Sequence, residues 1–191
     1  MESGGAAEQA ILQMAEQIER AIDDEMSRVD NMDDDDLAEI RKRRMKQLKE
    51  MDKRRVEWLQ KGHGIYDEVQ DLPQFFQVMK ASERVIVHFM RRATSRCMIL
   101  DRHLSQIAKE HFETKFMYVD VERHPSLAER FNIVMLPTLM LVEKQNTFHS
   151  IIGFDEFGGN DEFTTDVCCK VLGTHGMLND KGMFAADQND D

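Results

Sequence analysis

The stretch Arg84-Val-Ile-Val-His-Phe-Met90, continued by Arg91-Arg-Ala-Thr-Ser-Arg-Cys97, decides the fold. Residues 84–90 are a short run rich in β-branched side chains, which is typical of a central strand covered on both faces. Thr94 stands where a helix should begin, because a threonine hydroxyl can accept a backbone N–H at a helix N-terminus. A helix is predicted over about residues 97–111, so the stretch encodes a buried strand that leads into a helix.

Strand and helix patterns alternate on both sides of this stretch. Upstream, a short strand is predicted over residues 65–69, and Asp71-Leu72-Pro73 opens a helix with proline in its first turn. The order βαβαβαββα predicts an α/β domain with a mixed sheet and helices on both faces. The elements predicted downstream are a strand at 115–121, a short helix at 125–131, strands at 138–143 and 147–152, and a last helix at about 161–172.

The charge distribution separates an N-terminal appendage from this domain. The chain has 191 residues and a formal net charge of −11, and its length fits one ordinary domain plus an extension. Residues 1–40 hold 2 basic and 13 acidic side chains, whereas residues 41–61 hold 10 basic and 3 acidic ones. We expect no general nucleic-acid binding, because the phosphate backbone would repel all but residues 41–61.

Two amphipathic helices are predicted within the appendage, over residues 8–29 and about 35–60. In both, apolar residues recur every three or four positions, which is the period of one helical face. The second has a basic opposite face, and Gly62-His63-Gly64 ends it. The first stripe is Ile11, Met14, Ile18, Ile22, Met26 and Val29, and the second is Leu37, Ile40, Met45, Leu48, Met51, Val56 and Leu59.

Neither helix can bury its own stripe, and three uses of the stripes stay open. One is a homodimeric coiled coil or a self-packed hairpin, although the spacing is not a sustained heptad. A second is docking to a partner protein, since Met side chains adapt to irregular grooves. The third, binding to a membrane surface, is disfavoured because anionic lipid would repel the acidic first helix. The residues predicted to touch a partner are Ile11, Met14, Ile18, Ile22, Leu37, Ile40, Leu48 and Met51.

The sequence shows no targeting segment and no motif of a cofactor-dependent enzyme. Residues 1–10 have neither a basic nor an apolar region, and no stretch approaches the length that spans a bilayer, so we expect a cytosolic or nuclear protein. The three cysteines, Cys97, Cys168 and Cys169, form neither a disulfide framework nor the spaced pairs of a zinc site. We find no phosphate-binding loop and no nucleophile elbow, and we expect no cofactor and no metal.

Several motifs over residues 63–172 resemble a thioredoxin fold. They are Val85-Ile-Val-His-Phe, Cys97 at the start of a helix, Tyr118-Val-Asp-Val, and Met135-Leu-Pro137-Thr138 before a strand. The resemblance implies that the bond before Pro137 is cis and that this proline sits beside the redox position. A cis bond before proline costs little and persists where a fold requires it.

The departures from thioredoxin affect three functional positions at once. Thr94-Ser95-Arg96-Cys97 lacks the first cysteine of a Cys-x-x-Cys centre, Ala93 replaces a tryptophan, and His88 stands where an enzyme would bury an aspartate. A dithiol reductase needs one thiolate to attack a disulfide and a second cysteine to resolve the product. We therefore predict a protein that is not an enzyme, in which Cys97 is structural or vestigial and His88 is a satisfied core histidine.

Two further interpretations involve the surroundings of this position. Nearby cations favour a thiolate, and three arginines lie close to Cys97 in sequence: Arg91, Arg92 and Arg96. A monothiol redox-responsive role of Cys97 therefore stays an alternative. The same arginines could also dock an acidic surface of a partner protein. Phe154, Asp155 and Phe157 lie in or beside a Gly-rich acidic loop, which could present a binding edge. The alternative is that these phenylalanines cover the last helix.

A narrower resemblance extends over residues 8–175. The runs Trp58-Leu-Gln-Lys-Gly-His-Gly64, Asp101-Arg-His-Leu104, Gly153-Phe154 and Asp161-Glu-Phe-Thr-Thr165 are similar to the thioredoxin domain-containing protein 9 branch of the phosducin-like proteins. This resemblance implies a co-chaperone that binds the cytosolic chaperonin, lowers its ATPase and modulates the folding of actin and tubulin, hence microtubule organisation. It implies a cytoplasmic location, with the nucleus and centrosome as further sites.

The chain is therefore predicted to have three parts. Residues 1–62 form the helical appendage and residues 63–172 the thioredoxin-like domain. Residues 173–191 are rich in Gly, Asn and Asp and are expected to be disordered.

Overall fold

The computed structural model describes residues 34–179. The first predicted helix, which carries Ile11, Met14, Ile18 and Ile22, lies outside the described residues, as does the end of the chain after residue 179. The chain divides into two compact units, one that ends at Asp52 and one that begins at Lys53. The second unit holds the whole sheet.

Helix α2 (Asp34–Gln60) confirms the second predicted helix. Up to Asp52, its apolar stripe is open to solvent, because Leu37, Ile40, Met45 and Leu48 are between 38% and 55% exposed. Met51 is half-buried. The helix thus presents a row of apolar side chains, and helical propensity and its many charged residues keep it regular.

The end of α2 belongs to the second unit and is shaped by two glycines. Gly62 adopts φ +78°, and the N–H groups of Gly62 and His63 donate to the carbonyls of Leu59 and Trp58, each at 3.0 Å. This pattern is a Schellman motif, which terminates a helix at a left-handed residue. Gly64 also has a positive φ of +81°, and a Cβ there would lie 2.6 Å from Cε1 of Phe112. The motif therefore ends the helix and brings the chain close against Phe112.

His63 holds this corner in place between the two glycines. Burial lowers the pKa of its imidazole to about 4, so the ring is neutral. Its Nδ1 donates to the carbonyl of Phe112 at 2.6 Å, and its Nε2 accepts from the Ser82 hydroxyl at 2.8 Å. One neutral side chain thus joins the entry of the domain to two loops that are distant in sequence.

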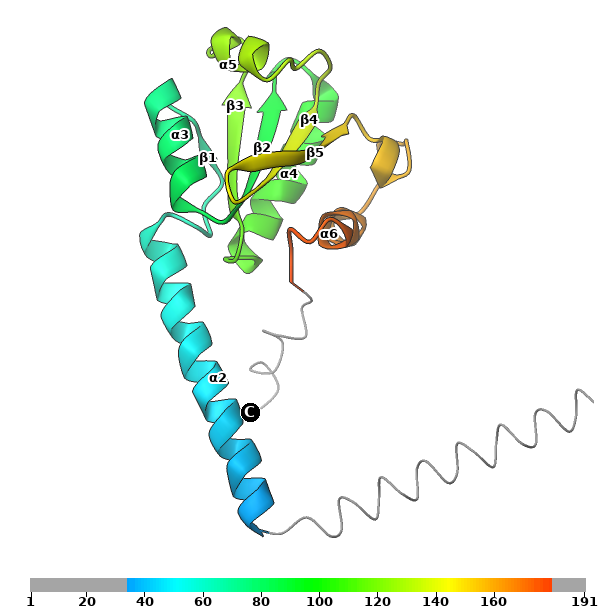
Figure 1. Cartoon of the computed structure of the whole chain (residues 1–191). Helices are drawn as coiled ribbons and strands as arrows, with labels where there is room; N and C mark the ends of the chain where they lie inside the picture. The colour runs from blue at the N-terminus through cyan, green and yellow to red at the C-terminus, as the bar shows by residue number, and fades with distance from the viewer. Residues whose placement is uncertain (1–33, 180–191) are drawn as a thin grey trace, which may run out of the picture. The chain divides into compact units, whose positions relative to one another are not determined.

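Five strands form one mixed sheet, in the order β1-β3-β2-β4-β5 (Figure 1). Strands β1, β3 and β2 are parallel, whereas β4 is antiparallel to β2 and to β5. Their bounds are β1 Asp67–Glu68, β2 Arg84–Met90, β3 Lys115–Asp120, β4 Thr138–Glu143 and β5 Asn146–Ile152. The predicted βαβαβαββα order is confirmed, and only β1 is much shorter than expected.

Strand β2 is buried on both faces and divides the core into two layers. Val85, Val87 and Phe89 pack with residues of α3 (Leu72–Ala81) and α5 (Pro125–Arg130). Ile86 packs on the opposite face with residues of α4 (Ser95–Glu110) and α6 (Thr165–Thr174). Because successive side chains of a strand point to opposite faces, β2 contributes side chains to both core layers.

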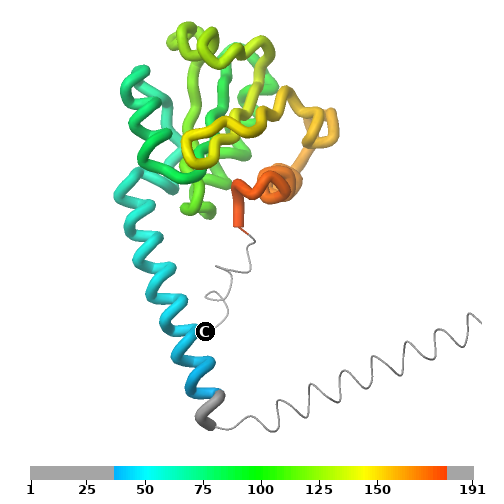
Figure 2. The backbone as a smooth tube through the Cα atoms, in the orientation of Figure 1, coloured from blue at the N-terminus to red at the C-terminus, as the bar shows by residue number. Residues whose placement is uncertain are grey.

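The hairpin of β4 and β5 carries a bulge, and its path can be followed in yellow in Figure 2. Leu141 pairs with His149 and Val142 with Thr147, so Phe148 is the extra residue on β5. Phe148 is 49% exposed. A bulge of this kind bends the strand and increases its local twist.

Two predictions near the C-terminus are wrong. The last helix begins at Thr165 instead of Asp161, because the Thr164 hydroxyl accepts the Val167 N–H and caps it there. Order also extends past residue 173, because Met177 and Leu178 are buried in the core layer of α4 and α6. The carbonyl of Met177 accepts from the hydroxyl of Thr114, so residues 173–179 belong to the domain.

A buried ion pair lies beside this C-terminal segment. Nδ1 of His111 and Oε1 of Glu113 are 2.8 Å apart, and the same oxygen accepts the Asn179 N–H at 2.9 Å. Burial disfavours a charged imidazole, but the nearby Cys169 and the hydrogen bond with Glu113 outweigh this effect and raise the pKa of His111 to about 9. For Glu113, burial raises the pKa, and the hydrogen bonds from His111 and Asn179 outweigh this and lower it.

This pair predicts a pH-dependent stability. The pKa of His111 is higher in the folded chain, so its contribution is complete below pH 6.5 and is lost as the pH rises through about 9. We expect the free energy of unfolding to fall by roughly 1–3 kcal/mol over that interval because of this group. Urea denaturation of the chain and of Glu113→Gln should show a flatter pH dependence for the variant, whose amide oxygen can still accept the Asn179 N–H. Parallel curves for the two proteins would contradict the prediction, and exposed Glu122→Gln is the control.

Candidate functional site

The predicted redox position lies where β2 passes into α4. Thr94 is the residue before the helix, but its hydroxyl makes no capping bond to a helical N–H. Instead the hydroxyl accepts from Nε of Arg91 at 3.2 Å, and the carbonyl of Thr94 accepts the Cys97 N–H at 3.1 Å. The expected side-chain cap is therefore wrong, because a charged guanidinium is the stronger donor for that oxygen.

Cys97 sits in the first turn of α4 and is fully buried. Burial raises the pKa of its thiol, and the opposing effects of Arg91 and Thr94 are smaller. Thiolate is the nucleophilic form of cysteine, and a raised pKa keeps its population low at neutral pH. The geometry therefore fits a structural or vestigial cysteine and disfavours a monothiol centre.

The three arginines near Cys97 are exposed, but each already has a partner on this chain. Arg91 donates to Thr94. Arg92 lies 3.3 Å from a Glu68 oxygen and 3.6 Å from an Asp120 oxygen. Arg96 lies 2.8 Å from Asp161 and also stacks over the Phe154 ring. An acidic partner would have to compete with these carboxylates.

His88 is fully buried on β2, on the same side of the sheet as Ile86. Its Nδ1 lies 2.7 Å from the Tyr66 hydroxyl, and the Asp101 carboxylate is a further neighbour of that hydroxyl. The other nitrogen, Nε2, has no hydrogen-bond partner. His88 is thus only half satisfied, which differs from the prediction.

Two of these polar groups, His88 and Tyr66, are poorly suited to the proton-shuttling role of the buried aspartate of an enzyme. Burial lowers the pKa of His88 to about 3, so the ring stays neutral at physiological pH. Burial, followed by the charge of Asp101, raises the pKa of Tyr66. Neither group can exchange a proton with a neighbouring thiol near neutral pH. The roles of Tyr66 and Asp101 were not predicted, because nothing in their spacing marks them as partners of His88.

The bond between Leu136 and Pro137 is cis, as the resemblance implied. Pro137 is buried, and its carbonyl accepts the Gly153 N–H at 2.8 Å. The two residues before Leu136 are open to solvent, with Val134 84% and Met135 60% exposed. The surface at this loop is therefore apolar.

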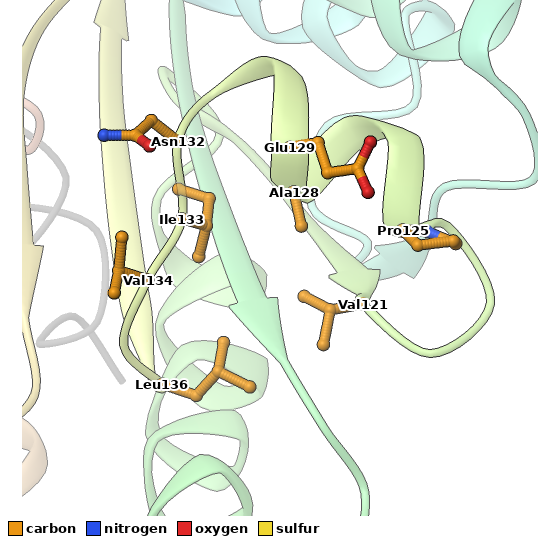
Figure 3. Close-up of a pocket in the computed structure, with 8 residues that line it drawn as sticks. All are labelled: Val121, Pro125, Ala128, Glu129, Asn132, Ile133, Val134 and Leu136. Carbon is orange, nitrogen blue, oxygen red and sulfur yellow. The ribbon is translucent and has the colours of Figure 1, made fainter.

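A pocket of about 410 Å³ lies beside this loop (Figure 3). It is formed by the end of β3, the short helix α5 and the residues that precede the cis bond. Figure 3 shows Val121, Ala128 and Leu136 on its walls and the Glu129 carboxylate at one side. The full lining is Val121, Pro125, Ala128, Glu129, Asn132, Ile133, Val134 and Leu136. The pocket offers mainly apolar contact, with one carboxylate at its side.

The loop that follows β5 does not form the expected aromatic binding edge. Phe154 and Phe157 are 1% and 2% exposed, and both pack against the Phe163 ring, with centroids 4.9 and 5.0 Å away. They belong to the core layer under α6, so only Asp155 of the three predicted residues is exposed. Of the predicted stripe on α2, Leu37, Ile40 and Leu48 are exposed.

Comparison with known proteins agrees with this architecture. The thioredoxin family model matches residues 68–158. A thioredoxin mutant from Halobacterium salinarum superposes with a TM-score of 0.51 at 16% identity, covering 61% of this chain and 95% of that one. This likeness shows the fold alone. Among the described helices, none is long and apolar enough to cross a membrane.

Curated relatives show the family. The human thioredoxin domain-containing protein 9 is 46% identical over 126 residues, which cover 66% of this chain and 56% of that protein. The mouse protein of the same name is 40% identical over 175 residues, or 92% of this chain and 77% of its own length. Phosducin-like protein 3 of Drosophila melanogaster is 39% identical over 66% of this chain and 58% of that protein. The chain therefore belongs to the thioredoxin domain-containing protein 9 family of phosducin-like proteins.

Proposed function

We propose that this chain is a non-catalytic co-chaperone that binds the cytosolic chaperonin, lowers its ATPase and modulates the folding of actin and tubulin. The partner is the one implied by resemblance to the phosducin-like proteins. The observation that carries the proposal is the state of the redox position, where a threonine and a fully buried cysteine replace a dithiol. A thioredoxin fold that lacks the dithiol is best explained as a protein that binds a partner.

The surfaces available for binding support this proposal. Residues 37–50 of α2 are exposed throughout, and they combine an apolar stripe with many basic side chains. Near the cis bond, Val134 and Met135 add a second apolar surface. Amphipathic helices of this kind bind grooves of partner proteins through their apolar face, while charges steer the encounter.

The mechanism would be differential binding. A protein that binds one nucleotide state of the chaperonin ring more tightly than the other shifts the ring toward that state. A tenfold preference corresponds to roughly 1.4 kcal/mol and changes the ratio of the two states tenfold at saturation. Slower ATP hydrolysis follows if the preferred state precedes the slow step, and actin and tubulin would be affected through that cycle in the cytoplasm.

The redox alternative makes a distinct prediction. In an insulin reduction assay with dithiothreitol, we expect the chain and Cys97→Ser to give the same rate as dithiothreitol alone, because the thiol is buried and has no resolving partner. An authentic thioredoxin serves as the positive control. A rate above background that disappears in Cys97→Ser would contradict the non-catalytic proposal.

Binding through α2 can be tested with two double variants that change the charge equally. In Ile40→Glu/Leu48→Glu, two negative charges interrupt the apolar stripe, whereas Lys42→Gln/Lys46→Gln removes two positive charges from the opposite face. We expect the first variant to lose at least about tenfold in affinity for purified chaperonin, as loss of buried apolar anchors does. Co-sedimentation and chaperonin ATPase should be measured in the same samples.

The control variant should bind more weakly only at low salt, since its charges act at long range. If Ile40→Glu/Leu48→Glu bound the chaperonin as tightly as the natural chain, the apolar stripe of α2 would not be the binding surface. Failure of the natural chain to bind at micromolar concentration would overturn the proposed function. Sedimentation at twice the monomer mass would instead favour the homodimeric alternative.

A further inference from the structure

Three side chains that are distant in sequence meet at one edge of the second unit. His149 lies on β5, Glu156 in the single turn η1 (Asp155–Phe157), and His175 directly after α6. Nε2 of His149 is 2.7 Å from one carboxylate oxygen of Glu156, and Nε2 of His175 is 2.7 Å from the other. The two imidazoles stack, with centroids 4.3 Å apart and planes 22° from parallel.

The three groups converge on a common point instead of forming separate pairs. Their potential ligand atoms all lie within 4.8 Å of one another. Zn²⁺ binds imidazole nitrogen and carboxylate oxygen at about 2.0–2.2 Å, so neighbouring ligand atoms of a tetrahedral site are roughly 3.3 Å apart. The 2.7 Å contacts are shorter because a proton occupies each one. A metal ion would replace these protons after a small outward movement of the side chains.

We propose that His149, Glu156 and His175 bind a zinc ion, with the fourth coordination position open to solvent. Two imidazoles and one carboxylate are a recognised ligand set for zinc, and their side chains are between 24% and 36% exposed, so a water molecule can complete the site. Among the described residues, no other group of three such side chains converges in this way.

The ion would add a direct bond between segments that packing and hydrogen bonds already join. His149 and Glu156 are seven residues apart, but His175 follows α6, and the buried Met177 and Leu178 come two and three residues later. A bond from the metal to His175 would tie the end of the domain to β5. Loop closure by a metal stabilises the folded chain because the unfolded chain lacks the preformed site.

The first test uses the full chain, freed of metal with a chelator and then dialysed. Titration with Zn²⁺, followed by calorimetry, should give one equivalent, and zinc at about 100 times its dissociation constant should raise the melting temperature by roughly 5–10 °C. Co²⁺ in place of zinc should give the absorption of a nitrogen and oxygen site. Absence of binding, or a sulfur-to-cobalt charge-transfer band from Cys169 or another thiol, would overturn the proposal.

Variants then assign the site. Glu156→Gln and His175→Gln should each lower zinc affinity by at least about 100-fold, since even the outer partners of metal ligands are worth 10- to 100-fold. Neighbouring Asp155→Asn and distant His103→Gln are matched controls and should bind as the natural chain does. Equal losses in variants and controls would overturn the assignment. Melting temperatures in chelator check that each variant is folded.

Discussion

The burial of β2 on both faces is the constraint on which the rest of the structure depends. The strand pairs with β3 on one side and β4 on the other, and its side chains from Val85 to Met90 are buried. Any polar side chain placed there must be neutral or paired, because a lone charge in such a layer is very unfavourable. His88 satisfies the first condition and only part of the second. The same enclosure places the following turn, with Thr94 and Cys97, at the edge of the core.

The residues at the redox position take part in the packing and hydrogen bonding of the domain. Cys97 packs as a small apolar residue. Burial raises the pKa of its thiol by more than the neighbouring Arg91 lowers it. The backbone at Pro137 joins the start of β4 to the turn after β5, because its carbonyl accepts the Gly153 N–H. Cys97 and Pro137 are thus part of the packed interior, whereas Arg91, Arg92 and Arg96 beside Cys97 are exposed.

The sequence predicted the strands best where local pattern and tertiary packing agree. The bounds of β2 and β4 were correct, because both runs are rich in apolar and β-branched residues that the sheet buries. Prediction failed where a side chain makes a tertiary contact in place of the contact that its local sequence suggests. The Thr94 hydroxyl was expected to cap α4, but it binds Arg91, and Phe154 and Phe157 were expected in a loop edge, but Phe163 draws them into the core. Met177 and Leu178 follow a polar, glycine-rich stretch that hides their burial, and no spacing rule joins residues 149, 156 and 175.

The bulge at Phe148 has a consequence for the behaviour of this chain in concentrated solution. Strand β5 is seven residues long and forms one border of the sheet, so its outer hydrogen-bonding groups could template an added strand from a second molecule. The opposite border, β1, is only two residues long and offers little to pair with. By breaking the regular spacing of donors and acceptors in the middle of β5, the extra residue denies an incoming strand a continuous ladder. A local irregularity in one hairpin thereby protects the whole fold against edge-to-edge aggregation.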